Sequence, residues 1–171
     1  MDERHENEQY FFDAATLARL RDLLGQWQAP CCICAPMVGK ALVDAGRPVT
    51  ILDIDERFST LPGFRHFDLV QPEWLADRFD VILCDPPFYN VSLSKLFETL
   101  RGLAHYDFKQ RLMVSFLSRR ARALERSFSP FGLTSTGFFP GYKTVEASAK
   151  NRIEFFANLE SSELGPLFAG A

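Results

Sequence analysis

Two kinds of apolar pattern alternate along this chain. Short continuous apolar runs predict buried strands, whereas apolar residues spaced three or four positions apart predict helices with one buried face. The expected strands are residues 31–35, 49–53, 64–67, 79–84, 112–117, 133–139 and 153–157. The expected helices are residues 14–27, 36–44, 92–104 and 118–128, with Asp13 as the N-cap of the first.

The order of these elements favours an α/β fold. Apolar strands that alternate with helices are typical of a mostly parallel sheet with helices on both faces. The last two strands follow each other without a helix between them, which predicts a C-terminal β-hairpin with a long connection. In open sheets of this kind the ligand lies beyond the carboxyl ends of the strands. We therefore expect the residues that follow positions 35, 53, 67 and 84 to share one crevice.

The size of the chain indicates one domain. Its 171 residues, 47% of them hydrophobic, suffice for a single core. We expect a domain over residues 9–160, a disordered segment at 1–8 and a tail at 161–171. No apolar run approaches the length of a membrane span, and the start does not resemble a signal peptide. We expect a cytoplasmic protein that does not bind a membrane.

The four cysteines do not indicate a metal site. Three of them, Cys31, Cys32 and Cys34, lie too close together for ordinary zinc-ligand spacing, and no histidine is near. We interpret them as small hydrophobic side chains in buried strands of a reduced protein. No metal is implied.

Charge is distributed unevenly. The net charge is −3, but residues 1–100 carry 9 Lys and Arg against 16 Asp and Glu, and residues 101–152 carry 10 against 3. These counts give −7 for the first part and +7 for the second. This asymmetry suggests a basic face where a polyanion such as nucleic acid docks, although solvated helix faces would give the same counts.

The sharpest chemical signal is Asp85-Pro86-Pro87-Phe88, directly after the apolar run 79–84. Two prolines remove two backbone donors and stiffen the turn, which leaves carbonyl oxygens free to face the crevice. A carboxylate and a carbonyl can hold the two hydrogens of an acceptor amino group. Phe88 can stack on a flat base or enclose an alkylammonium group. We predict the acceptor site of an amino-group methyltransferase, which acts mainly by positioning the amine at a sulfonium methyl group.

Three further carboxylates follow expected strands. Asp53 ends the second strand, where a carboxylate accepts hydrogen bonds from ribose hydroxyls. Asp55 is close by, but we favour Asp53 because it sits at the strand end. Asp68 follows the third strand and can accept from an adenine amino group of a cofactor.

The first loop is a weak point for nucleotide binding. Such turns are usually rich in glycine so that the backbone can approach the ligand. Here the segment is CAPMVGKAL, with Gly39 as its one glycine. The small turn Ala35-Pro36 can still bring the backbone close.

Taken in order, these motifs make the chain resemble the family of probable N6-adenine methyltransferases with a DPPF motif. The resemblance spans about residues 9–159 and rests on Gln9-Tyr10-Phe11-Phe12, CAPMVGKAL, Asp53-Ile54-Asp55-Glu56-Arg57-Phe58, Phe67-Asp68, Asp85-Pro86-Pro87-Phe88 and the C-terminal NRIEFFANL. The DPPF and DIDERF segments are specific, and the others are supportive. The family includes lysine methyltransferases that act on a translation elongation factor and a zinc-finger enzyme that methylates adenine in ribosomal RNA.

The resemblance implies a Rossmann-like class I methyltransferase with seven strands, an antiparallel last hairpin and S-adenosylmethionine (SAM) as cofactor. It implies that Tyr10, Phe11 and Phe12 close over the methionine end of the cofactor, and it adds Asp85 to the cofactor-binding residues. The zinc fingers of the ribosomal RNA enzyme are absent here. RNA targeting would then fall to a partner protein or to the basic second half of the chain.

Three functions follow from this resemblance. We favour adenine-N6 methylation of RNA, with ribosomal RNA first and DNA possible, because Tyr142-Lys143 and residues 150–158 look closer to the RNA-modifying branch. Phe88, on which the base would stack, and Tyr89, Tyr142 and Lys143 are then candidate substrate-binding residues, and Arg119 and Arg122 are candidates to bind phosphates. A protein-lysine methyltransferase would use the same site. Its methylation would rise sharply with pH, because a lysine must lose its proton before attack. A catalytically inactive, partner-binding domain is the third alternative.

Overall fold

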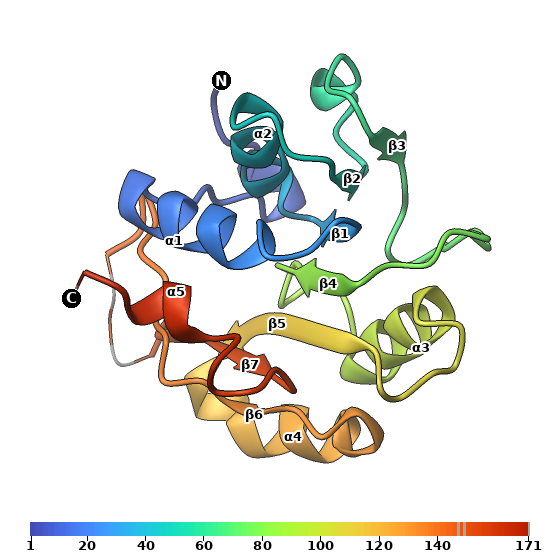
Figure 1. Cartoon of the computed structure of the whole chain (residues 1–171). Helices are drawn as coiled ribbons and strands as arrows, with labels where there is room; N and C mark the ends of the chain where they lie inside the picture. The colour runs from blue at the N-terminus through green and yellow to red at the C-terminus, as the bar shows by residue number, and fades with distance from the viewer. Residues whose placement is uncertain (147, 149, 171) are drawn as a thin grey trace.

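Within residues 1–146, 148 and 150–170, which the computed structural model describes, seven strands form one central sheet (Figure 1). The strands are β1 Pro30–Ile33, β2 Thr50–Asp53, β3 Phe64–His66, β4 Val81–Cys84, β5 Arg111–Leu117, β6 Thr134–Ser135 and β7 Ile153–Ala157. They lie in the order β3-β2-β1-β4-β5-β7-β6. The first five are parallel, and β7 runs antiparallel to both β5 and β6. The predicted α/β architecture with an antiparallel C-terminal edge is confirmed.

Helices cover both faces of the sheet. One face packs against α1 (Ala14–Leu24), α2 (Pro36–Asp44) and α5 (Gly165–Phe168), and the other against α3 (Leu93–Leu103) and α4 (Ala121–Ser127) (Figure 1). Because successive strand side chains point to opposite faces, Val81 and Leu83 of β4 join one core and Ile82 and Cys84 join the other. No helix among the described residues has the length and apolar character needed to cross a membrane.

The helix ends follow from local capping. The Asp13 carboxylate accepts a hydrogen bond of 2.8 Å from the N–H of Thr16 at the start of α1. Ser92 Oγ accepts one of 3.1 Å from the N–H of Lys95 at the start of α3. Pro36 occupies the first turn of α2, where a missing N–H costs nothing. Beyond the other end of α2, Gly46 has a φ of +69°, which only glycine adopts readily.

The antiparallel edge differs most from the sequence prediction. We expected one strand over residues 133–139, but regular pairing covers Thr134–Ser135 alone. Gly137 has a φ of +74°, which breaks the extended chain. Pairing resumes beyond the break, where the N–H of Phe155 donates to the carbonyl of Phe138 at 3.0 Å.

Both ends of the chain contact the domain. In the segment expected to be disordered, residues His5–Asn7 form a short 3-10 helix, η1, and the Glu3 carboxylate accepts a hydrogen bond of 2.8 Å from the N–H of Phe11. In the expected tail, α5 buries Leu167 against α1. The N-terminal segment also pairs with the loop before β7, because the N–H of Asp13 donates to the carbonyl of Gly141 at 2.9 Å.

Candidate active site

A cavity of about 830 Å³ opens at the carboxyl ends of the parallel strands. The segments that follow β1, β2, β3 and β4 line it together, and so do the N-terminal segment 6–12 and parts of the loop between β6 and β7. Its size is in the range of sites that bind cofactors and small ligands. The predicted residues in its lining are Tyr10, Phe11, Phe12, Ala35, Pro36, Asp53, Asp68, Asp85, Pro86, Pro87, Phe88, Tyr89 and Tyr142.

The Asp85 carboxyl group is fixed from two elements. Its backbone N–H donates to the carbonyl of Ile33 in β1 at 3.1 Å, which holds the segment after β4 against its neighbour. The Ser115 hydroxyl in β5 donates to Asp85 Oδ1, so Oδ2 remains available to a second donor. Burial raises the pKa of Asp85 to about 7, and the nearby Asp53 carboxylate adds to the rise, while the Ser115 and Tyr142 hydroxyl groups oppose it as hydrogen-bond donors.

The rest of the DPPF segment forms a rigid apolar wall. Pro86 is buried, and the Phe88 ring packs edge-on against Phe116 with 5.6 Å between ring centroids. Tyr89 is 67% exposed at the outer end of the segment. Its backbone N–H donates to the Glu8 carboxylate at 3.1 Å, so the N-terminal segment contacts the side of the cavity that follows β4.

Asp53 and Asp55 lie in different surroundings. Asp53 lines the cavity at 5% exposure, and burial raises its pKa to about 6. Its Oδ1 accepts a hydrogen bond of 2.8 Å from the N–H of Asp55. Asp55 lies outside the cavity lining and forms an ion pair of 2.7 Å with Arg57. Burial alone would raise its pKa, but the bonds from Arg57 and Gln9 lower it to about 2.

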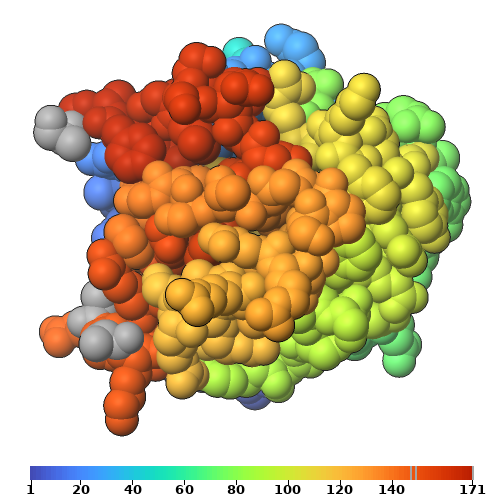
Figure 2. Space-filling model, turned by 90° about the horizontal axis from the view of Figure 1, so that it is seen from below, coloured from blue at the N-terminus to red at the C-terminus, as the bar shows by residue number. Residues whose placement is uncertain are grey.

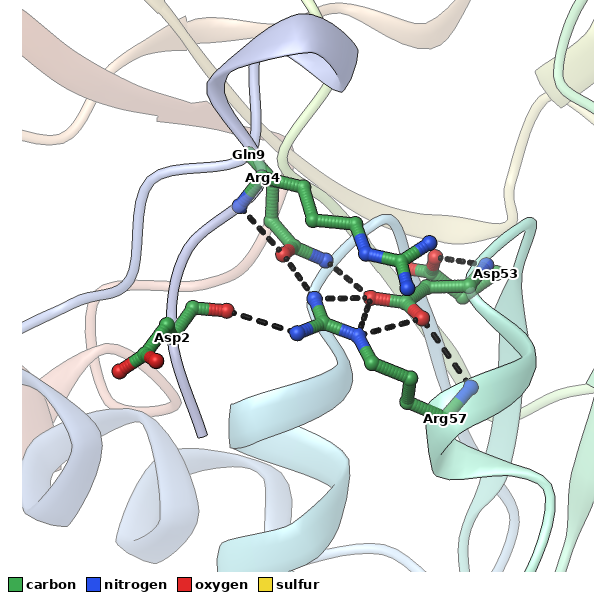
Figure 3. Close-up of polar contacts among 6 residues, drawn as sticks. Asp2, Arg4, Gln9, Asp53 and Arg57 are labelled. Carbon is green, nitrogen blue, oxygen red and sulfur yellow. Dashed lines mark hydrogen bonds and ion pairs between the residues drawn. The ribbon is translucent and has the colours of Figure 1, made fainter.

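The Asp55 cluster anchors the N-terminal segment to the end of β2. Gln9 Nε2 donates to Asp55 Oδ2 at 2.9 Å, and Arg57 donates to Gln9 Oε1 at 2.9 Å and to the carbonyl of Asp2 at 2.9 Å (Figure 3). The structure thus places Asp55, the second candidate for the cofactor after Asp53, outside the cavity lining, where its carboxylate holds residues 9–12 over the cavity.

The first loop turns without a glycine. Cys34 has a φ of +55°, the left-handed conformation that glycine usually supplies, and its N–H donates to the carbonyl of Leu52 at 3.0 Å. Gly39 serves another purpose: a Cβ there would lie 2.5 Å from Ile51, so this glycine allows α2 to pack closely on β2. The turn at Cys34 lets the small Ala35 line the cavity.

Aromatic side chains of the N-terminal segment close part of the cavity. Phe11 and Phe12 are buried, and Phe12 packs on Tyr142 with 5.1 Å between ring centroids. Tyr10 is 37% exposed and stacks on His5. Asp68, also in the lining, accepts a hydrogen bond of 2.9 Å from the N–H of Val70.

Three predicted substrate residues lie outside the lining. Arg119 lies beside the cavity residue Tyr89, with 3.3 Å between its Nη2 and the Tyr89 hydroxyl oxygen. Lys143 Nζ lies 5.9 Å from the centre of the Phe11 ring, on the outside of the N-terminal segment. Arg122 is exposed on α4 and contacts solvent.

Four site residues were not predicted from the sequence. Ser115 could have been noticed as the one polar residue within the apolar run LMVSFL of β5. Glu8 lies in a segment expected to be disordered and gave no signal. Phe139 and Arg152 both line the cavity and stack, with 3.6 Å from the guanidinium carbon to the ring centroid, although they lie 13 positions apart in the sequence.

Comparisons with known proteins agree with this fold. Among solved structures, the fold is similar to a proposed RNA methyltransferase of Pyrococcus horikoshii, at 13% identity and a TM-score of 0.59, with 91% of this chain and 89% of that chain covered. It is also similar to magnesium protoporphyrin IX methyltransferase of Synechocystis PCC 6803 with bound SAM, at 17% identity and a TM-score of 0.56, with 84% and 75% covered. A comparison with curated proteins gives no match.

At these identities the solved structures establish the fold, and the family follows from the sequence. A family model described as probable N6-adenine methyltransferase matches residues 3–161, which includes every segment that lines the cavity. The chain therefore belongs to the probable N6-adenine methyltransferase family.

Proposed function

We propose that this protein is a SAM-dependent methyltransferase that modifies the N6 amino group of adenine in RNA, with ribosomal RNA favoured and DNA the other candidate nucleic acid. The observation that carries the proposal is the Asp85 carboxyl group, held by Ser115 beside Phe88 in the cavity. A hydrogen-bond acceptor next to an aromatic ring suits a flat base with an exocyclic amino group.

The residues in the cavity fit SAM, which supplies an electrophilic methyl group when bound. Asp53 offers a buried carboxylate at the end of β2, where ribose hydroxyls would donate to it. Asp68 lies after β3 in the same lining and can accept from an amino group. Phe11 and Phe12 give an apolar wall that excludes water from one side. A volume of about 830 Å³ leaves room for an acceptor group beside a nucleoside cofactor.

On the acceptor side, the chain would act by orienting the amino group. An ionised Asp85 accepts one N–H, and the carbonyl of Pro86 can accept the other, because neither proline of the segment offers a competing backbone donor. Phe88 is held by Phe116, so a stacked base would meet a ring of fixed orientation. Adenine carries no proton that must leave before attack, so the proposal assigns no general base.

The basic second half of the chain supports a nucleic-acid substrate. Arg119, Arg122 and Arg126 are exposed on the segment that leads into and along α4. Residues near 120–130, golden to orange, form part of the surface seen in Figure 2. None of the three forms an ion pair within the described residues. The contact of Arg119 with Tyr89 connects this surface to the DPPF segment. Phosphate groups near these guanidinium groups would bring a nucleotide to the cavity. A targeting partner protein could contribute further contacts.

Protein-lysine methylation is the second candidate. Phe88 and the exposed Tyr89 beside the Asp85 carboxyl group also suit an alkylammonium side chain. A lysine must lose a proton before attack, so its methylation would continue to rise at pH values well above the pKa of Asp85. Adenine methylation would instead reach a plateau at pH values well above the pKa of Asp85. A catalytically inactive, partner-binding domain is the third candidate, and it would transfer no label.

The test uses purified protein, methyl-labelled SAM and total lysate from cells that lack the gene. Labelled samples are divided among RNase, DNase and protease. Asp85→Ala serves as the site variant, and Asp80→Ala, at the opposite end of β4, as the matched control. Binding of SAM to each protein is measured separately by calorimetry.

We expect label that only RNase removes. This label should persist with Asp80→Ala and be lost with Asp85→Ala. Label that only protease removes would reject the RNA substrate in favour of lysine. Label that only DNase removes would identify DNA as the substrate. No label and no SAM binding would reject enzymatic function altogether.

A further inference from the structure

The hydroxyl group of Tyr142 is a buried polar group without a partner. It lines the cavity, has no hydrogen-bond partner among the described residues and lies near the Asp85 carboxyl group. As a nearby hydrogen-bond donor, the hydroxyl lowers the pKa of that carboxyl group, but the two groups do not form a hydrogen bond of normal geometry. A buried hydroxyl that stays unpaired costs free energy, so it calls for a ligand that completes it.

The Tyr142 side chain is held in place from several sides. Its ring packs on Phe12 at 5.1 Å between centroids, and the same two residues form a β-bridge. On either side, the carbonyl of Gly141 accepts from the N–H of Asp13 and the N–H of Lys143 donates to the carbonyl of Phe11, both at 2.9 Å. A Cβ at Gly141 would lie 2.0 Å from the Asp13 carboxylate, so the close approach of the two segments depends on this glycine. The hydroxyl therefore has a fixed position in the cavity.

The two groups differ in what they offer a ligand. Burial, together with the nearby negative charge of Asp85, raises the pKa of Tyr142 well above its usual value, so its hydroxyl stays protonated and can donate. Asp85 accepts the Ser115 hydroxyl at Oδ1 and has Oδ2 left to accept a second donor. The cavity thus presents a hydrogen-bond donor and an acceptor side by side.

We propose that Tyr142 is a specificity-determining residue whose hydroxyl donates to adenine N1 while Asp85 accepts from the adjacent N6 amino group. The inference rests on the proposed function and deepens it. Adenine presents an amino donor and a ring-nitrogen acceptor next to each other on one edge, which matches the donor and the acceptor of the cavity. A lysine amine offers no acceptor beside its nitrogen that would satisfy the tyrosine hydroxyl.

The test is a cycle that combines one protein change with one atom change in the RNA. Tyr142→Phe removes the hydroxyl and retains the ring that packs on Phe12. The substrate is a synthetic RNA of about 24 nucleotides around the adenine mapped in the labelling experiment, prepared with adenine or with 1-deazaadenine, in which a C–H group replaces N1, at that position. Initial rates at saturating SAM are measured for all four combinations. Tyr106→Phe, at an exposed tyrosine outside the cavity lining, is the matched control.

With the parent RNA, Tyr142→Phe is expected to lower kcat/KM about ten- to hundred-fold. The wild-type protein should lose a similar factor on 1-deazaadenine RNA, and the variant should lose little more on that RNA, because both changes remove the same bond. Tyr106→Phe should behave like the wild type. Thermal denaturation and the Kd for SAM are expected to be unchanged in Tyr142→Phe, which excludes misfolding as the cause.

Other results would overturn the inference. Independent, multiplicative losses for the two changes would show that the hydroxyl does not contact N1. A higher Kd for SAM with a normal rate at saturating SAM would assign Tyr142 to the cofactor. If the wild-type protein does not methylate the parent RNA, the proposed function fails, and the inference fails with it. If the parent RNA is methylated but the cycle is multiplicative, the inference alone fails.

Discussion

Replacing Ser115 with alanine should move the pH dependence of methylation to higher pH. The Ser115 hydroxyl donates to Asp85, and a hydrogen bond to a charged acceptor contributes about 1.5–3 kcal/mol against about 0.5–1.5 kcal/mol for a neutral one. The midpoints of these ranges differ by about 1.25 kcal/mol, which favours the ionised form and corresponds to about one pKa unit. Because the pKa of Asp85 is about 7 with Ser115 present, we expect about 8 in Ser115→Ala.

The sign follows from the role of the carboxylate. An ionised Asp85 accepts a hydrogen bond from the N–H of the acceptor amine. A protonated Asp85 carries a hydrogen on one oxygen, and that oxygen no longer serves as the acceptor. In the wild-type protein, kcat/KM should therefore rise with pH, reach half its maximum near pH 7 and stay level above about pH 8. In Ser115→Ala the ionised fraction at pH 7 falls from about one half to about one tenth, which predicts roughly five-fold lower kcat/KM there. Near pH 9 the two proteins should have similar values.

The assay measures initial rates of methyl transfer from labelled SAM to RNA between pH 5.5 and 9. Ser135→Ala is the matched control, because the Ser135 hydroxyl also donates to a carboxylate, that of the buried Glu154, but neither residue lines the cavity. This control should leave the half-maximum pH unchanged. A half-maximum pH that does not move in Ser115→Ala, or that moves downward, would refute the role assigned to Asp85.

Three further changes test other parts of the site. Asp53→Asn should weaken SAM binding about ten- to hundred-fold in calorimetry, because a buried carboxylate that accepts from ribose hydroxyls loses its charge; an affinity within about two-fold of wild type would contradict this role. Cys34→Gly should be more stable than Cys34→Ala by about 1 kcal/mol, or about 2–4 °C in Tm, because residue 34 has a φ of +55°. A more stable alanine variant would argue against the left-handed turn. Combining Arg119→Ala with Arg122→Ala should lower the slope of log K against log salt concentration for single-stranded RNA binding by up to about 1.4, whereas Arg21→Ala on α1 should leave that slope unchanged. Equal slopes for the double variant and the wild type would exclude phosphate contacts at α4.

Local sequence signals predicted most of the fold. The apolar runs gave the strands, and the alternation with helices gave the parallel sheet, because both faces of such a sheet must be covered. Asp13 as an N-cap was also correct, since its side chain binds within its own helix. The prediction was poorest at the strand over residues 133–139, where one left-handed residue, Gly137, interrupts a segment whose apolar pattern continues.

The site was harder to predict where it depends on contacts between distant residues. Asp85 and Asp53 follow strands and could be placed from the topology rule alone. The surroundings of Asp55 could not be predicted in this way, because they depend on Gln9, which lies 46 positions earlier in the sequence. The turn at Cys34 was missed for a different reason: sequence patterns associate a positive φ with glycine, and a cysteine in that conformation gives no signal.

The central claim is that the cavity methylates adenine N6 in RNA with Asp85 as the acceptor of the amino group. The most direct measurement is mass spectrometry of nucleosides from RNA treated with SAM and either the wild-type protein or Asp85→Ala. The account predicts N6-methyladenosine with the wild-type protein and none with the variant, while the Tm of the two proteins is similar. Methyllysine in the protein fraction, with no change in RNA nucleosides, would contradict it.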